Sequence, residues 1–222
     1  MFRTEQEAGL NGRDLAYPRG RVIGGCSAIN AMIYMRGQAA DYDHWRQLGL
    51  PGWGWDDVLP IFKKHEDHFG GASKLHGAGG EWRVEEPRIR WPILNAVQEA
   101  GEEIGIRKID DFNTGDNEGS SYFQVNQKRG RRWSAARGFL RPALSRNNLS
   151  LMTGVQVERL VIENGRATGV TFQRDGESIT QRCKSEIILA AGAVGTPQIL
   201  ELSGIGDGAR LTSLGIPVQR HV

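Results

Sequence analysis

A glycine-rich stretch near the start of the chain limits its folding more than any other feature. A polar, Pro-led turn enters Arg19-Gly-Arg-Val-Ile-Gly-Gly-Cys-Ser-Ala-Ile-Asn30, in which Gly24 and Gly25 stand side by side and small residues follow. Adjacent glycines allow backbone angles that other residues avoid, and they let the backbone approach a flat or bulky group. A bound cofactor would explain this pattern, and so would a tight packing turn. On this stretch alone we favour the packing turn.

Length and composition indicate a globular chain of one or two domains. The 222 residues are 39% hydrophobic, and the net charge of +2 gives no support for a nucleic-acid or membrane-surface partner. No apolar run approaches the roughly 20 residues of a membrane-spanning helix, and the first residues lack the apolar segment of a signal peptide. The two cysteines, Cys26 and Cys183, form no CxxC motif, so we predict a reducing, cytoplasmic location.

Helical patterns lie in the middle of the chain. Acidic residues in the first turn predict a short helix over 41–48, and Asp56 is the predicted cap of a second helix. Apolar residues at helical spacing predict a third helix over 91–104, and Ser134 is the predicted cap of a fourth over 134–144. Short strands are predicted over 81–85 and 122–127, with loops over 69–80 and 110–121.

Three groups of side chains invite a functional interpretation, and a structural one is favoured for each. His65 and His68, with Glu66 between them and His76 beyond, are predicted to form a solvated helix end and no metal site, because no companion ligand cluster follows. The basic run 128–132 is predicted to be a surface loop and no nucleic-acid site. Aromatic core packing is predicted for four tryptophans: Trp53, Trp55, Trp82 and Trp91.

The last third of the chain changes to β-type patterns. Runs over 149–152, 155–162, 167–174 and 178–184 are joined in part by Asn-Gly and Asp-Gly turns, which are strong hairpin signals. An antiparallel meander is therefore predicted. It leads into Glu186-Ile-Ile-Leu-Ala-Ala191, which is apolar enough for a buried strand of a parallel sheet.

A glycine turn and a helix follow this apolar run. Thr196 is the predicted N-cap and Pro197 the first residue of a helix that ends at Leu202. Ligands of open α/β sheets bind at the carboxyl ends of strands, where helix N-termini attract phosphates. The strand–turn–helix pattern is therefore a second place where a nucleotide cofactor fits.

Together the two glycine-containing motifs resemble the glucose–methanol–choline (GMC) family of FAD-dependent oxidoreductases. Residues 20–30, followed by Tyr34, Gly37 and Asp43, resemble its first signature, and Gly192-Ala-Val-Gly-Thr-Pro-Gln-Ile-Leu-Glu-Leu-Ser-Gly-Ile-Gly206 resembles its second. The resemblance extends over essentially the whole chain and is strongest to choline-dehydrogenase-like bacterial alcohol dehydrogenases. It implies FAD, and oxidation of a primary or amino alcohol, choline-like or aliphatic, by hydride transfer to the flavin.

The resemblance also implies which residues contact FAD. Val157 is expected to contact the adenine end through its main chain. Some relatives attach the flavin covalently to a histidine at the position of Ile29, so noncovalent FAD is expected here. The residues expected along the flavin and its chain are Val22, Gly24, Gly25, Cys26, Asn30, Ala31, Met32 and Ile33.

Two departures from the family limit what the chain is expected to do alone. It contains neither the GxGxxG pyrophosphate motif nor the late histidine segment that takes the substrate proton, so no catalytic residue is predicted. We expect an internal piece of a flavoenzyme that binds FAD weakly or not at all. A hydroxynitrile-lyase-type enzyme of the same fold and a cofactor-free structural piece are the alternatives, and the electron acceptor stays open.

The expected fold is mixed α/β, a partial Rossmann-like FAD-binding domain with a meander plus part of the substrate-side lid. Four segments are predicted. Residues 1–45 and 146–215 belong to the FAD-binding part, 46–145 to the lid or substrate-side insertion, and 216–222 start a return to the substrate domain.

Overall fold

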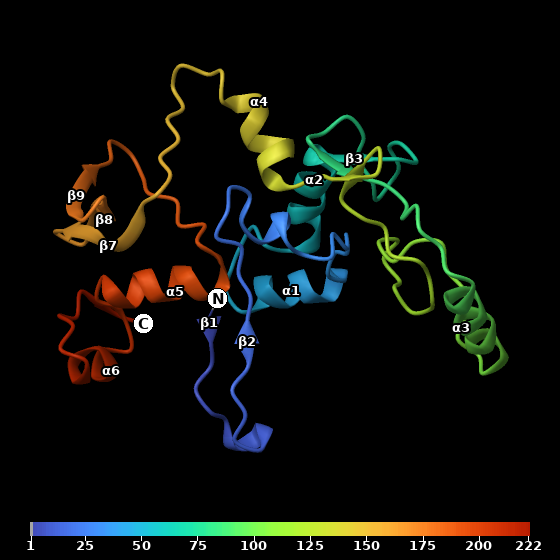
Figure 1. The fold of residues 1–222 in the computed structure, drawn as a ribbon, viewed down its shortest axis with the longest axis horizontal. Helices are drawn as coiled ribbons and strands as arrows, with labels where there is room; N and C mark the ends of the chain where they lie inside the picture. Colours follow the sequence, from blue (N-terminus) through green and yellow to red (C-terminus); the bar gives the residue numbers. More distant parts are fainter. Residues whose placement is uncertain (1) are drawn as a thin grey trace. The chain divides into compact units, whose positions relative to one another are not determined.

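The chain divides into two units between Leu149 and Ser150. The computed structural model describes residues 2–222, and Figure 1 traces them from the blue N-terminal end to the red C-terminal end. Helices and strands contribute to both units, so the predicted mixed α/β class is confirmed. Each unit buries apolar side chains of its own, such as Val84 in the first and Leu211 in the second, both 0% exposed.

The first unit consists of short elements separated by long loops. Its strands and helices are β1 (Phe2–Arg3), η1 (Ala8–Leu10), β2 (Ala16–Tyr17), η2 (Gly25–Ala28), α1 (Ala39–Gln47), α2 (Trp55–His65), β3 (Glu66–His68), β4 (Trp82–Val84), α3 (Pro92–Glu103), β5 (Gln127–Lys128), β6 (Arg131–Arg132), η3 (Ala136–Leu140) and α4 (Arg141–Ala143). Among residues 2–222, no helix combines the length and the hydropathy that a bilayer crossing requires.

Helices α1 and α2 pack through the buried ring of Tyr42, whose centroid lies 5.7 Å from that of Phe62. The prediction that Asp56 caps α2 is wrong, because Gly54 is the N-cap. The side chain of Asp57 accepts the Gly54 N–H at 3.2 Å, and Asp43 accepts the Trp55 N–H at 3.1 Å. Two carboxylates therefore satisfy free amides at the start of α2. One belongs to Asp57, one residue later than predicted, and the other belongs to Asp43 of α1.

Only two of the four tryptophans expected in the core are packed there. Trp55 lies 5.7 Å from Tyr42, and Trp82 stacks on Phe139 at 5.5 Å between ring centroids. The remaining two, Trp53 and Trp91, are 52% and 59% exposed, so the prediction is wrong for them. Trp53 lies in the turn before α2, and Trp91 is the N-cap of α3, a helix that buries none of its residues.

A three-way backbone contact at Val125 joins distant parts of the first unit. Val125 bridges both Ile33 and Glu85, and β3 pairs in parallel with β4. The prediction of a continuous strand over 122–127 is wrong. Ile33 and Glu85 each pair with Val125 through a single isolated bridge, and regular strand pairing starts only at Gln127 in β5.

Two helices of the first unit match their predicted positions. Helix α3 starts with Pro92 at its first turn, as the pattern indicates. Residues 136–143 are helical, but η3 is a π turn whose N-cap is Ala135, so the prediction that Ser134 caps this helix is wrong. The Ser134 carbonyl instead accepts the Arg137 and Gly138 N–H groups. Pro142, the second residue of α4, has no N–H to donate, so one regular α-helical bond is missing there.

The second unit contains the predicted meander. Its elements are β7 (Gln156–Glu163), β8 (Arg166–Arg174), β9 (Glu177–Arg182), α5 (Gly192–Leu202), β10 (Ile205–Gly206), α6 (Gly208–Ser213) and β11 (Arg220–His221). Strands β7, β8 and β9 pair antiparallel in that order. Asn164 and Gly165 have φ of 52° and 74°, and both central residues of the next turn are also positive, as two-residue primed hairpin turns require.

The meander is tied to helix α5 by a buried serine. Leu160 of β7 donates its N–H to Ser203 Oγ at 2.8 Å, and that hydroxyl donates to the Ile199 carbonyl at 2.5 Å. Leu160, Phe172 and Ile199 are each 8% exposed or less. This hydroxyl therefore links the sheet to the C-terminal turn of α5 within an otherwise apolar core.

The buried parallel strand predicted over 186–191 is not present. No strand of residues 2–222 pairs with this run, and Ile188 is 80% exposed. An apolar run becomes a buried strand only when neighbouring strands cover it on both sides, and the described residues supply none. Within the described part of the chain, the run 149–152 likewise forms no strand, contrary to its predicted β-type pattern.

The helix after this run begins earlier than predicted. Helix α5 starts at Gly192, so Pro197 lies inside it and Thr196 is no N-cap residue. The Thr196 hydroxyl instead accepts the N–H of Ala191, which is the N-cap, at 3.1 Å. The threonine therefore secures the start of the helix from inside it.

Candidate functional site

The glycine-rich stretch forms the 3₁₀ turn η2 and the loop that leads into it. Gly24 and Gly25 both have positive φ, 97° and 54°, in the left-handed region that favours glycine. A Cβ on Gly24 would lie 3.2 Å from Ala136 Cβ, whereas a Cβ on Gly25 would meet nothing within 4 Å. The first glycine therefore serves packing, and the second presents bare backbone to open space.

Apolar side chains around η2 are unusually exposed. Val22, Ile23, Ile29 and Ile33 are 55%, 46%, 50% and 45% exposed. Cys26, Asn30 and Ala31 are also exposed, and Met32 is half-buried. The eight residues predicted along the flavin thus lie on one short segment with an open, largely apolar surface. The ninth, Val157, lies on β7 of the second unit, opposite Phe172.

The Arg132 side chain and the Ala135 backbone amide hold this segment in place. Ser27 Oγ accepts the Ala135 N–H at 2.9 Å and donates to the Gly24 carbonyl at 2.5 Å. Arg132 donates to the Ser27 carbonyl at 3.2 Å and to Asn30 Oδ1 at 3.0 Å. Arg132 therefore anchors η2, and the basic run, predicted to be a plain surface loop, includes the tight β5–β6 hairpin.

The chain after Asn30 runs on as an irregular segment, with Met32 at a φ of 64°, between polar partners. Met32 accepts the Asn126 N–H at 2.8 Å, and Tyr34 donates its N–H to the Gln124 carbonyl at 2.8 Å. Arg36 donates its backbone N–H to Asn113 Oδ1, also at 2.8 Å. These bonds fix the segment that carries Met32 and Ile33.

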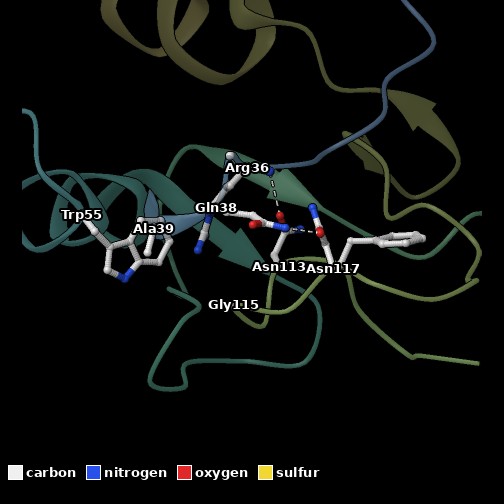
Figure 2. A pocket seen from close by; sticks show the side chains of 9 residues that line it. Arg36, Gln38, Ala39, Trp55, Asn113, Gly115 and Asn117 are labelled. Carbon is white, nitrogen blue, oxygen red and sulfur yellow. Dashed lines mark hydrogen bonds between the residues drawn. The ribbon is translucent and has the colours of Figure 1, made fainter. Parts of the chain in front are cut away.

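A small hollow lies beside this segment. Figure 2 shows Arg36, Gln38 and Trp55 on its walls, with Asn113 and Asn117 opposite. The Arg36 N–H bonds across the hollow to Asn113, and the Gln38 side chain bonds across it to Asn117. These two hydrogen bonds close the hollow, so it offers no open cleft for a ligand.

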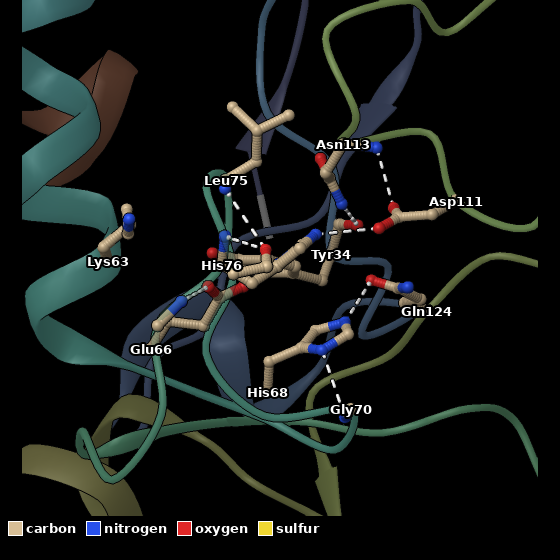
Figure 3. A network of polar contacts seen from close by, with 12 residues as sticks. Tyr34, Lys63, Glu66, His68, Gly70, Leu75, His76, Asp111, Asn113 and Gln124 are labelled. Carbon is tan, nitrogen blue, oxygen red and sulfur yellow. Dashed lines mark hydrogen bonds and ion pairs between the residues drawn. The ribbon is translucent and has the colours of Figure 1, made fainter.

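The histidines predicted to form a solvated helix end are instead largely buried. Glu66 is 0% exposed, and His68 and His76 are 8% and 6% exposed. The prediction is wrong because α2 passes directly into β3, which pairs with β4 and turns residues 66 and 68 inward. Figure 3 shows His76 between the carboxylates of Glu66 and Asp111.

Both nitrogens of His76 contact a carboxylate. Nδ1 lies 3.0 Å from Glu66 Oε1, and Nε2 lies 2.7 Å from Asp111 Oδ2. Burial acts to lower the pKa of His76, but the hydrogen bonds to Asp111 and Glu66 and the charge of both carboxylates raise it to about 9. Burial and the neighbouring charge of His76 lower the pKa of His68.

The same cluster has the composition of a metal site but not its bonding. His68, His76 and Asp111 place one ligand atom each within 4.8 Å of one another. A metal ligand needs a free nitrogen lone pair, and a His76 that donates to two carboxylates has none. His68 Nδ1 accepts the Gly70 N–H at 3.2 Å. The arrangement favours a buried imidazolium over a metal site.

The sequence carried one signal for this cluster. Glu66 and His68 alternate on one strand, so their side chains share a face, and a strand after α2 would have placed both inside. The cluster's other members, His76 and Asp111, lie further along the chain than this strand, and no short-range pattern relates them to it.

Comparisons with known proteins identify the family. The GMC oxidoreductase family model matches residues 5–222. The chain is 43% identical to an oxygen-dependent choline dehydrogenase of Sinorhizobium fredii, over 98% of this chain and 40% of that protein. It is 42% identical to the mitochondrial choline dehydrogenase of Homo sapiens, over 100% of this chain and 37% of that protein.

Solved structures agree. Pyridoxine 4-oxidase from Mesorbium loti matches with a TM-score of 0.93 at 35% identity, over 99% of this chain and 44% of that one. An FAD-dependent oxidoreductase from Chaetomium thermophilum matches with a TM-score of 0.94 at 31% identity, over 100% of this chain and 41% of that one. The chain thus spans about 40% of the length of these curated relatives. It belongs to the GMC oxidoreductase family.

Proposed function

We propose that residues 22–33 form one wall of an FAD site in an enzyme that oxidises an alcohol. The observation that carries this proposal is the bare, left-handed backbone at Gly25, which faces open space beside exposed apolar side chains. A flavin ring is flat and largely apolar, so it needs a wall without projecting side chains. The residues present fit this group, and family membership supports the assignment.

The relatives named choline dehydrogenase support a primary or amino alcohol as the substrate. Bound FAD would supply the hydride acceptor. This chain would supply the apolar contact surface at Val22 and Ile33 and the rigid backbone between them, held by Ser27 and Arg132.

FAD is proposed to bind noncovalently. Ile29 is exposed and aliphatic, so it offers no nucleophile to the flavin. Val157 is proposed to contact the adenine through its main chain, which is supported by the register shift that interrupts the β7–β8 ladder between Val157 and Arg159.

Location and segment roles complete the proposal. The free state of Cys26 and Cys183 supports a reducing, cytoplasmic location. We assign residues 1–45 and 146–215 to the FAD-binding part and residues 46–145 to the lid or substrate side. Residues 216–222 are assigned to the start of the chain's return to the substrate domain.

The test uses protein made from the complete reading frame that contains these residues. It should purify yellow, and choline or an aliphatic alcohol should bleach the flavin under anaerobic conditions. Bound flavin that no alcohol reduces would favour a lyase of the same fold, and colourless protein would contradict the FAD site.

A pair of glycine variants tests the contact itself. Gly25→Ala should weaken flavin binding about tenfold or more, because a Cβ would project into the contact surface. Gly105→Ala is the matched control, because Gly105 also has positive φ and open space around it but lies outside residues 20–33. Equal flavin affinity of the two variants would contradict the proposed wall.

A further inference from the structure

Four buried residues and the partly buried Asp111 form a closed ring of polar contacts, here called the polar ring. Arg36 Nη2 lies 2.8 Å from Glu66 Oε2, and Glu66 Oε1 lies 3.0 Å from His76 Nδ1. His76 Nε2 lies 2.7 Å from Asp111 Oδ2, and Asp111 Oδ1 accepts the Asn113 N–H at 2.7 Å. Asn113 Oδ1 accepts the Arg36 N–H at 2.8 Å, which closes the ring. Figure 3 shows its central part.

The polar ring grips the end of the proposed flavin-contact segment. Asn113 Nδ2 donates to the Tyr34 carbonyl at 3.2 Å, so one asparagine holds both Tyr34 and Arg36. On the other side, Gln124 accepts the Tyr34 N–H. Tyr34 follows Ile33 directly, so the position of the flavin-contact residues 22–33 depends on these hydrogen bonds.

His76 is the member that joins the two halves of the ring. Through Glu66 it reaches the Arg36 guanidinium, and through Asp111 it reaches Asn113 and the Arg36 backbone. A neutral imidazole donates one hydrogen bond, whereas an imidazolium donates two. Only the protonated form can therefore satisfy both carboxylates.

The charged groups around His76 come from four parts of the first unit. Glu66 and His68 lie on β3, Asp111 lies in the loop after α3, and Tyr34 and Arg36 precede α1. Lys63 of α2 is turned to the Lys74 carbonyl, to which Nζ donates at 3.0 Å. His68 stacks on His76 at 3.9 Å and is neutral, since its Nδ1 accepts the Gly70 N–H. The ring's charges therefore cancel when His76 is protonated, and loss of that proton leaves an unbalanced carboxylate.

We propose that His76 is a positioning residue, which as an imidazolium locks the Tyr34–Arg36 end of the flavin-contact segment and releases it when the proton is lost. This inference rests on the proposed function for its consequence at the flavin, but the lock itself is a property of the chain alone.

The direction of the pH effect follows from the two states of His76. Its pKa is about 9 in the fold, against an ordinary value of 6.5. The contribution of the lock is therefore complete below pH 6.5, falls as the pH rises from 6.5 to 9, and is lost above that range.

The first experiment observes the unsubstituted chain. Nitrogen-15 NMR should show both His76 nitrogens protonated at pH 7. Hydrogen exchange at the Tyr34 and Asn126 amides, corrected for intrinsic rates, should lose about tenfold protection between pH 7 and pH 9. The Val170 amide in β8 is the internal control. A neutral His76 at pH 7, unchanged protection, or stoichiometric Zn²⁺ binding at His76 would overturn the proposal.

The second experiment compares variants. His76→Gln should abolish the pH dependence at Tyr34, whereas His44→Gln, which removes an exposed histidine on α1, should keep it. If His76→Gln still shows the pH dependence at Tyr34, or if His44→Gln loses it, the assignment to His76 is overturned. If His76→Gln does not fold, the first experiment decides.

Flavin affinity separates this inference from the proposed function. In complete protein, flavin should dissociate more readily at pH 9 than at pH 7. In His76→Gln, the difference in flavin dissociation between the two pH values should be smaller. Colourless protein with intact pH-dependent exchange contradicts the flavin site alone. Bound flavin together with a neutral His76 contradicts the lock alone.

Discussion

The meander and the polar ring are both ordered, but they are stabilised in different ways. Strands β7, β8 and β9 are joined by two-residue turns and bury apolar side chains such as Phe172, 4% exposed. The polar ring buries four charges from residues 36, 66, 76 and 111, whose positions depend on several loops. The meander should therefore respond to changes of volume and turn conformation, and the polar ring to the loss of a single charge.

The largest effect is expected from Glu66→Gln. It leaves Arg36 and His76 short of one negative charge in a buried site, which should cost about 3–5 kcal/mol of unfolding free energy. All six tryptophans lie within residues 45–133, so urea unfolding followed by tryptophan fluorescence reports on this unit. Glu86→Gln is the control, since it breaks only the exposed pair with Arg90 and should cost less than about 0.5 kcal/mol. Equal costs would remove the distinction drawn for the polar ring.

In the meander, Phe172→Ala should have the largest effect, about 3 kcal/mol, because it opens a cavity opposite Val157. Hydrogen exchange of the Val170 amide measures it. Ile179 is the β9 partner of Phe172 and is itself 36% exposed. Ile179→Ala should therefore lower the free energy of unfolding by less than about 1 kcal/mol. A larger loss at Ile179 would show that the stabilising contacts lie on the outer strand.

A single polar contact in the apolar core makes the comparison sharper. Ser203→Ala leaves the buried Leu160 N–H without its acceptor and should cost about 1–2 kcal/mol by thermal unfolding followed by far-ultraviolet circular dichroism. Ser213→Ala, whose exposed hydroxyl donates to Arg210, should lower the free energy of unfolding by less than about 0.5 kcal/mol. Matching values would mean that the meander does not depend on this hydroxyl.

The smallest effect is expected at a turn. Gly165→Ala places a Cβ on a residue with φ of 74° and should cost about 1 kcal/mol in the same thermal measurement. Gly9→Ala, with open space and no positive φ, should not destabilise the chain. If Gly165→Ala were as stable as Gly9→Ala, the inference that the turn residues stabilise the meander would be wrong.

The same contrast explains which features could be predicted from the sequence. Asn164-Gly165 and Asp175-Gly176 encode their turns within four residues, so the meander could be predicted correctly. The glycine pair at 24 and 25 was recognisable for the same reason. The polar ring brings together residues up to 77 apart, as Arg36 and Asn113 show, and no local pattern carries that information. The strand predicted over 186–191 failed because strand formation depends on neighbours, which no single segment encodes.

That unpaired segment has a practical consequence. Ile187-Ile-Leu-Ala-Ala191 has no charge and no proline, and Ile188 is 80% exposed. Short β-prone segments of this kind self-associate when they are accessible. Solutions of the 222-residue chain should therefore aggregate at high concentration, and Ile188→Lys should keep them clear.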